Sequence, residues 1–66
     1  MYKLVYSNES DSNKLNAKNI VGIDNMTDKA PNLIIIGLLE HDCDYCHLYL
    51  NGSYISTFGP ISTNLS

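Results

Sequence analysis

The stretch YCHLYLNGSYISTF, residues 45–58, carries the strongest local structural signal in the chain. Within it, Asn51-Gly52 separates two runs in which apolar and polar side chains alternate. A pair of this kind predicts a two-residue type I′ turn, which joins two antiparallel strands directly. We therefore expect a β-hairpin whose strands cover residues 45–50 and 53–58.

The predicted turn also fixes which residues face each other, with Leu48 opposite Ile55 and Tyr45 opposite Phe58. Because side chains alternate along a strand, this register gives the hairpin an aliphatic and an aromatic face. Tyrosine is enriched at interfaces, so we expect the aromatic face to be either a second core layer or a protein-binding site. The aliphatic face holds Cys46, Leu48, Leu50 and Ile55, and the aromatic face holds His47 and the candidate protein-binding residues Tyr45, Tyr49, Tyr54 and Phe58.

Three further segments have strand patterns. Residues 2–7, YKLVYS, alternate, and residues 19–23, NIVGI, form a short apolar run. Residues 33–39, LIIIGLL, are continuously apolar and fit a central strand that is buried on both faces. The predicted fold class is mainly β, a small single domain over residues 1–66. It has about five short antiparallel strands with a C-terminal β-meander or hairpin, and at most one short helix.

The remaining segments are polar or contain turn residues. Residues 8–19 are rich in Asn and Ser and predict a long loop or a weak helix that Ser10 or Asp11 would cap and that would run through Lys18. Residues 24–32 predict a connection, with room for one helical turn that ends near Pro31. Residues 59–66 are expected to be a loose tail.

The charge of the chain limits the classes of partner that it is expected to bind. It has 66 residues, a net charge of -3, four lysines and no arginine. Phosphate neutralisation supplies most nucleic-acid affinity, and basic clusters hold proteins on anionic membranes, so we expect neither direct nucleic-acid binding nor membrane binding. An acidic surface instead favours a basic protein as partner. The N-terminus has no apolar segment typical of a signal peptide, which predicts a cytoplasmic location.

The stretch EHDCDYCH, residues 40–47, gathers the residue types that bind metals. Two thiolates at C-x-x-C spacing supply half of a tetrahedral zinc site. The candidate ligands are Cys43, Cys46, His41 and His47, but so short a loop can hardly wrap a tetrahedron. A homodimer that shares Cys43 and Cys46 from each chain would solve this geometric problem.

Other interpretations of the same stretch stay open. Cys43 to His47 satisfies the C-x-x-C-H string of haem c attachment, and a C-x-x-C pair can also form a redox site. The simplest interpretation is a structural turn, in which the aspartates favour the turn and Cys46 is a small buried hydrophobic residue.

No motif in the chain predicts catalysis, so no catalytic residues are assigned and we do not expect an enzyme. The sequence predicts a small, acidic, non-catalytic protein-binding or regulatory module. One form of this hypothesis is an inhibitor of a larger basic protein, such as a nucleic-acid-processing protein, of the type encoded by phages and mobile elements. The alternative is the zinc-binding homodimer, and apart from that zinc no cofactor is expected.

Overall fold

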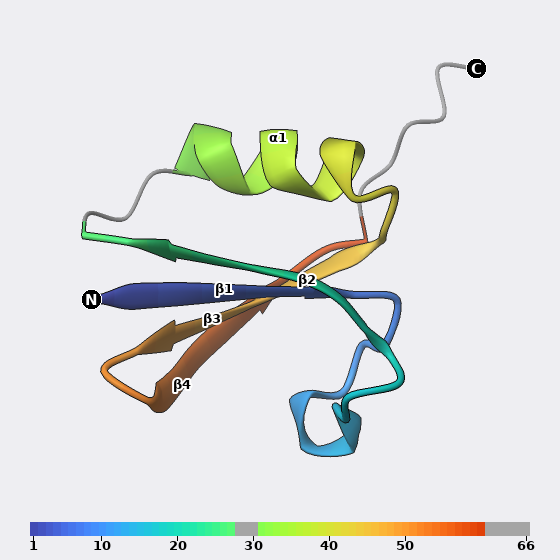
Figure 1. Cartoon of the computed structure of the whole chain (residues 1–66), viewed down its shortest axis with the longest axis horizontal. Helices are drawn as coiled ribbons and strands as arrows, with labels where there is room; N and C mark the ends of the chain where they lie inside the picture. Colours follow the sequence, from blue (N-terminus) through green and yellow to red (C-terminus); the bar gives the residue numbers. More distant parts are fainter. Residues whose placement is uncertain (28–30, 61–66) are drawn as a thin grey trace.

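The computed structural model describes residues 1–27 and 31–60, with the side chains of residues 31–33 outside that description. Its sheet has four antiparallel strands in the order β2-β1-β3-β4, and one helix lies over one face (Figure 1). The predicted mainly β fold with one short helix is therefore confirmed. The elements are β1 (Tyr2–Ser7), the 3-10 helix η1 (Ser12–Lys14), β2 (Ile20–Met26), α1 (Pro31–Glu40), β3 (Tyr45–Leu50) and β4 (Ser53–Phe58).

The predicted central strand over residues 33–39 was wrong, because this segment lies in α1. A continuous apolar run does not by itself distinguish a buried strand from a helix that packs on a sheet. Pro31 occupies the first position of the helix, where its fixed φ is favourable, so it begins a helix rather than ending one. Ile34 and Leu38, four residues apart, are both buried. Within residues 1–27 and 31–60, the sheet thus has four strands rather than the expected five or so.

The helix ends in a Schellman turn, which explains much of the EHDCDYCH stretch. The Cys43 amide donates to the Leu38 carbonyl at 3.1 Å, and the Asp42 amide donates to the Leu39 carbonyl at 3.2 Å. Asp42 has φ of 54°, the left-handed conformation that this motif needs. Cys43 and Leu38 also belong to the same apolar cluster, which is the hydrophobic contact typical of the motif.

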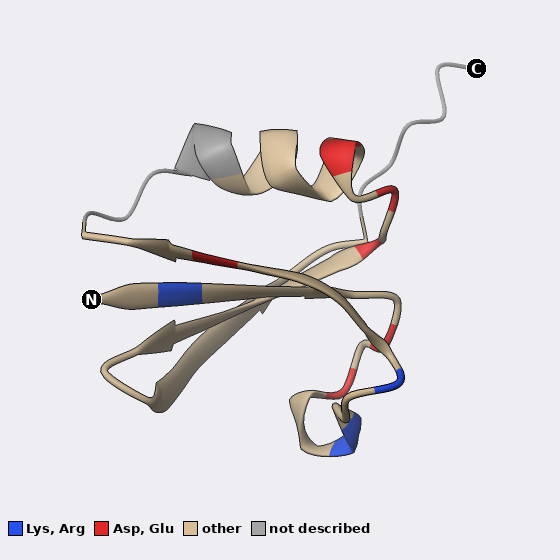
Figure 2. Ribbon diagram, viewed as in Figure 1, with Lys and Arg blue, Asp and Glu red and all other residues tan. Residues whose placement is uncertain are grey.

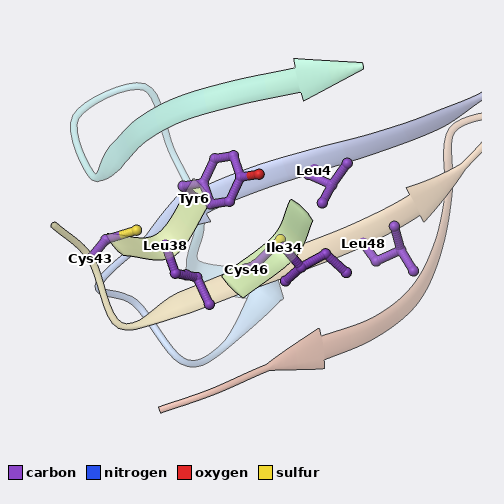
Figure 3. Close-up of a cluster of buried hydrophobic side chains, with 7 residues drawn as sticks. All are labelled: Leu4, Tyr6, Ile34, Leu38, Cys43, Cys46 and Leu48. Atoms are coloured by element: carbon purple, nitrogen blue, oxygen red, sulfur yellow. The ribbon is translucent and has the colours of Figure 1, made fainter. Parts of the chain in front are cut away.

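The core lies between α1 and the two central strands, β1 and β3 (Figure 3). Gly37 allows the helix to approach β1 closely, because a Cβ at this position would overlap the ring and hydroxyl of Tyr6. Tyr2, Met26 and Phe58 pack against the edge of this cluster. The buried side chains are Leu4, Tyr6, Ile34, Leu38, Cys43, Cys46 and Leu48.

The hairpin turn at Asn51-Gly52 is confirmed, since both residues have positive φ and join β3 to β4. The predicted register is right next to the turn, where Tyr49 faces Tyr54, but it shifts between Tyr49 and Leu48. Leu48 therefore faces Ser56 rather than the expected Ile55, and the residue opposite Cys46 is Phe58.

The bulge in the hairpin corrects the predicted faces. Phe58 packs against the helix-covered core instead of lying opposite Tyr45 on the aromatic face. Ile55, expected on the aliphatic face, is exposed. A single extra residue in one strand reverses every face assignment beyond it, and nothing in the local sequence marks the site of insertion.

The polar N-terminal segment forms less helix than expected. The side chain of Asp11 accepts a hydrogen bond from the Asn13 amide and caps η1, which ends at Lys14. β2 is longer than the predicted strand over residues 19–23, because it runs on to Met26. Most of the predicted loose tail, residues 61–66, lies outside the described residues.

Candidate functional site

The four candidate metal ligands lie in different environments. Cys46 points into the core beneath α1, whereas its neighbour His47 is buried on the opposite face of the sheet. Cys43 follows the helix end, and its thiol donates to the Tyr45 carbonyl at 3.8 Å. His41 packs against the ring of Tyr6, with centroids 4.7 Å apart.

Both cysteines are free and buried, which lowers their reactivity. Burial raises the pKa of Cys46 to about 12, with smaller contributions from Cys43 and Asp24. Burial and the nearby Asp44 carboxylate also raise the pKa of Cys43. At neutral pH both side chains are therefore thiols. The thiolate is the form that binds metal and attacks disulfides.

His47 is held by a hydrogen-bond network on the face away from α1. Its Nε2 lies 2.7 Å from the Glu9 carbonyl, which can only accept, so this nitrogen carries the proton. Its Nδ1 lies 2.8 Å from the Thr57 hydroxyl, which also lies 2.7 Å from the Tyr54 hydroxyl. His47 thus joins the loop before η1 to β3 and β4, a structural role that occupies both ring nitrogens.

Among the described residues, no group of three or more His, Cys, Asp or Glu side chains is arranged to hold a metal ion. The sheet separates Cys46 from His47, as the alternation of a strand requires. A zinc site shared between two chains would require both buried thiols to become accessible.

The predicted aromatic site is only partly assembled. Tyr49 and Tyr54 face each other across the hairpin, with ring centroids 5.8 Å apart in an edge-on arrangement. Tyr45 lies two residues before His47 on β3 and is half-buried, and Phe58 belongs to the other face. The face away from α1 also has a hollow of about 290 Å³. It is lined by Lys3, Val5, Leu15, Ile20, Tyr49 and Gly52.

The sequence interpretation missed the exposed side of α1. Ile35, Ile36 and Leu39 are 52%, 46% and 56% exposed, although the helix packs on the sheet through Ile34 and Leu38. A surface helix normally carries polar residues on its outer side. The continuous apolar run over residues 33–39 could have indicated this exposed apolar side. The strand prediction placed these side chains in the core, so their exposure was not expected.

A groove separates α1 from β2 on the same side of the molecule. Its volume is about 230 Å³, and it combines apolar walls with two carboxylates, Asp24 and Glu40. Tyr6 also lines this groove, and the pKa of its phenol is raised first by burial and then by the nearby Asp24 carboxylate. The lining residues are Tyr6, Asp24, Asn25, Met26, Ile36, Gly37 and Glu40.

Charges are unevenly distributed around this groove (Figure 2). Acidic segments occur at the C-terminal end of α1, in the turn after it and within β2. Among the described residues, the lysines lie elsewhere. Lys3 lines the hollow on the face away from α1, Lys14 ends η1, and Lys18 precedes β2.

Comparisons with models of protein families, with curated proteins and with solved structures found no match to this chain. Within the described residues, no helix has the length and apolar character needed to cross a membrane.

Proposed function

We propose that this chain is a small non-catalytic module that binds a larger, basic protein through the exposed side of α1. We define the α1 surface as Ile35, Ile36 and Leu39 together with the neighbouring carboxylates of Asp24 and Glu40. The observation that carries the proposal is the exposure of three large apolar side chains on one short helix.

An apolar outer side is unusual for a helix that faces solvent. A helix that is apolar on all sides is typically covered on both sides, here by the sheet on one side and by a partner on the other. Contiguous exposed apolar residues mark interaction sites in small proteins, and carboxylates at the border resemble the polar rim of an interface.

The charges favour a basic partner over an acidic one. The chain carries a net charge of -3, and the described lysines lie away from the α1 surface. Complementary charge would accelerate association and exclude acidic proteins, with an effect that weakens as salt increases. Such a module would inhibit its partner by covering a basic surface, and it would do so in the cytoplasm, where cysteines remain thiols.

The face away from α1 offers a matched control, because it also exposes an apolar ring. Tyr54 is about as exposed as Ile36 and lies on β4. Replacing Tyr54 by Asn therefore removes exposed apolar area from the molecule without changing the α1 surface. Replacing Leu39 and Ile35 by Asn removes it from the α1 surface, in positions where the side chains have few packing partners to lose.

The proposal can be tested by affinity capture from a lysate of the organism that encodes the chain. We expect the tagged protein to recover one basic protein in stoichiometric amount at low salt and less of it at moderate salt. The Ile35→Asn/Leu39→Asn variant should lose this protein, and Tyr54→Asn should retain it.

Two results would contradict the proposal. Recovery of no stoichiometric protein at either salt concentration would remove its basis. Retention of the partner by the α1 variant, together with its loss in Tyr54→Asn, would assign binding to the aromatic face instead. Circular dichroism of each variant shows whether the fold is intact.

A further inference from the structure

The starting observation is that β2 is an edge strand of the sheet. Among the residues that the structure describes, β2 pairs with β1 on one side only, whereas β1 and β3 each have two neighbouring strands. In an edge strand, alternate backbone N–H and C=O groups point away from the sheet and are available to another strand. β2 contains neither lysine nor proline, two residues that commonly protect such edges. Its pairing with β1 is regular from Gly22 to Met26.

The free edge of β2 lies beside the α1–β2 groove. Ile36 and Glu40 are four residues apart on α1 and line this groove, so they form the flank of the helix that faces β2. Asp24 and Met26 line it from β2. A strand added to β2 would place every second side chain on the helix side of the sheet, next to this flank.

From this arrangement we infer that the partner supplies an extended basic segment, which adds to β2 as a fifth strand. One Lys or Arg side chain of that segment enters the α1–β2 groove between Asp24 and Glu40. This inference rests on the proposed function and specifies how the basic partner is recognised. It belongs to a known physical mode, in which backbone hydrogen bonds supply affinity and pockets for alternate side chains supply specificity.

The lining of the groove favours a long cationic side chain. Ile36 and Met26 offer apolar contacts to its methylene groups, and the two carboxylates can accept hydrogen bonds from its charged end. Tyr6 also lines the groove beside Asp24. An apolar side chain in the groove would displace water from the two carboxylates and offer them no hydrogen bond or opposite charge in return.

A second copy of the chain fits this edge less well. Asp24 lies one residue from the centre of β2, so antiparallel pairing of two β2 strands would bring both Asp24 carboxylates near the symmetry axis. Like charges in such positions destabilise a sheet. The repeated Glu40 would add to this repulsion.

The test uses a displayed library of peptides with about eight random residues, the length of an ordinary strand. We expect selection on the folded protein to enrich peptides that contain Lys or Arg within an alternating pattern. Methylation of one backbone nitrogen at a time should weaken binding at every second position, because only alternate amides face β2. Asp24→Asn and Glu40→Gln should each weaken binding of an enriched peptide about five- to tenfold. Asp44→Asn, a matched charge change outside the groove lining, should leave it unchanged.

Several outcomes would overturn this inference. These are enrichment of peptides without basic residues, equal effects of methylation at all positions, or equal effects of Asp24→Asn and Asp44→Asn. If the protein dimerises with increasing concentration and substitutions in β2 abolish the dimer, the edge of β2 would be assigned to a second copy of the chain. The groove can fail separately from the proposed function. A captured basic partner that requires Leu39 but is insensitive to Asp24→Asn and Glu40→Gln would uphold binding through the apolar residues of the α1 surface and reject the groove.

Discussion

At the scale of single residues, Asp42 shows how a polar cluster suggestive of a metal site serves as a helix end. Its left-handed backbone lets the chain turn from α1 toward β3. Glycine is the usual residue at this position, since an L side chain is strained there. Without a glycine, the sequence gives little warning that a Schellman turn is present, and the nearby cysteines favour a metal interpretation instead.

We predict that Asp42→Gly stabilises the fold by about 0.5–1 kcal/mol. The substitution relieves the left-handed strain and removes a negative charge next to the helix C-terminus, and these gains exceed the entropy that glycine adds to the unfolded chain. Urea denaturation measures the change. Asp42→Ala is the control, because it removes the same charge but keeps the strain. Greater stability of the alanine variant than of the glycine variant would show that backbone strain does not govern this site.

The raised pKa values of the buried Cys46 thiol and Tyr6 phenol predict how the stability of the fold depends on pH. Cys46 has its pKa raised from 9.0 to about 12 in the folded protein, mainly by burial, so the unfolded chain loses this proton first. Stability from Cys46 is therefore complete below pH 9 and decreases above it by about 1.4 kcal/mol per pH unit. Tyr6, whose pKa is also raised, adds a further decrease above pH 10.

Urea denaturation at a series of alkaline pH values, combined with thiolate absorbance of the folded protein, measures this dependence. We expect the free energy of unfolding to decrease before any thiolate forms in the native state. Thiolate formation in the folded protein at the ordinary pKa of cysteine would contradict the buried placement of Cys46.

At the scale of elements, the hairpin and α1 show what sequence patterns can and cannot determine. Asn51-Gly52 predicts its turn because the positive φ angles depend on those two residues alone. The apolar run over residues 33–39 predicts that this segment is buried, but not whether it forms a strand within the sheet or a helix that packs on it. Isoleucine favours strands. Here the segment forms a helix, whose packing on the sheet buries Leu4 of β1 and Leu48 of β3. The bulge before Tyr49 and the exposed side of α1 depend on tertiary packing, so local patterns could not locate them.

We predict that Gly37→Ala destabilises the protein by about 1–3 kcal/mol, although alanine is the better helix former by about 1 kcal/mol. The added methyl group would overlap the Tyr6 ring, which lies beneath the helix. Thermal denaturation of a double-mutant cycle with Tyr6→Leu measures the coupling. We expect Gly37→Ala to be much less harmful in the Tyr6→Leu background, and an equal cost in both backgrounds would exclude this overlap as the cause.

At the scale of the whole molecule, α1 has a buried apolar core on one side and exposed apolar residues on the other. Four strands and one helix bury Leu4, Leu38 and Leu48, but nothing in the described residues covers Ile35 or Leu39. Charge and size alone indicate no particular surface for the protein-binding hypothesis, and the candidate surface comes from the arrangement of α1 on the sheet.

We predict that a metal chelator leaves the melting temperature and solution mass of the purified protein unchanged. Cys43 and Cys46 contribute to the fold as buried, neutral thiols, and their pKa values are raised. Native mass spectrometry with and without chelator reports bound metal and oligomeric state, and thermal denaturation of the same samples reports the melting temperature. A zinc-bound dimer that dissociates and melts earlier in chelator would instead support the shared zinc site.

The most direct test of the α1 surface is site-specific photo-crosslinking in the lysate of the organism that encodes the chain. A photoreactive side chain is placed at position 39 on the α1 surface or at position 54 on the opposite face. We predict that position 39 forms a covalent adduct with one basic protein and that position 54 does not. An adduct formed from position 54 alone, or no adduct from either position, would contradict binding through the α1 surface.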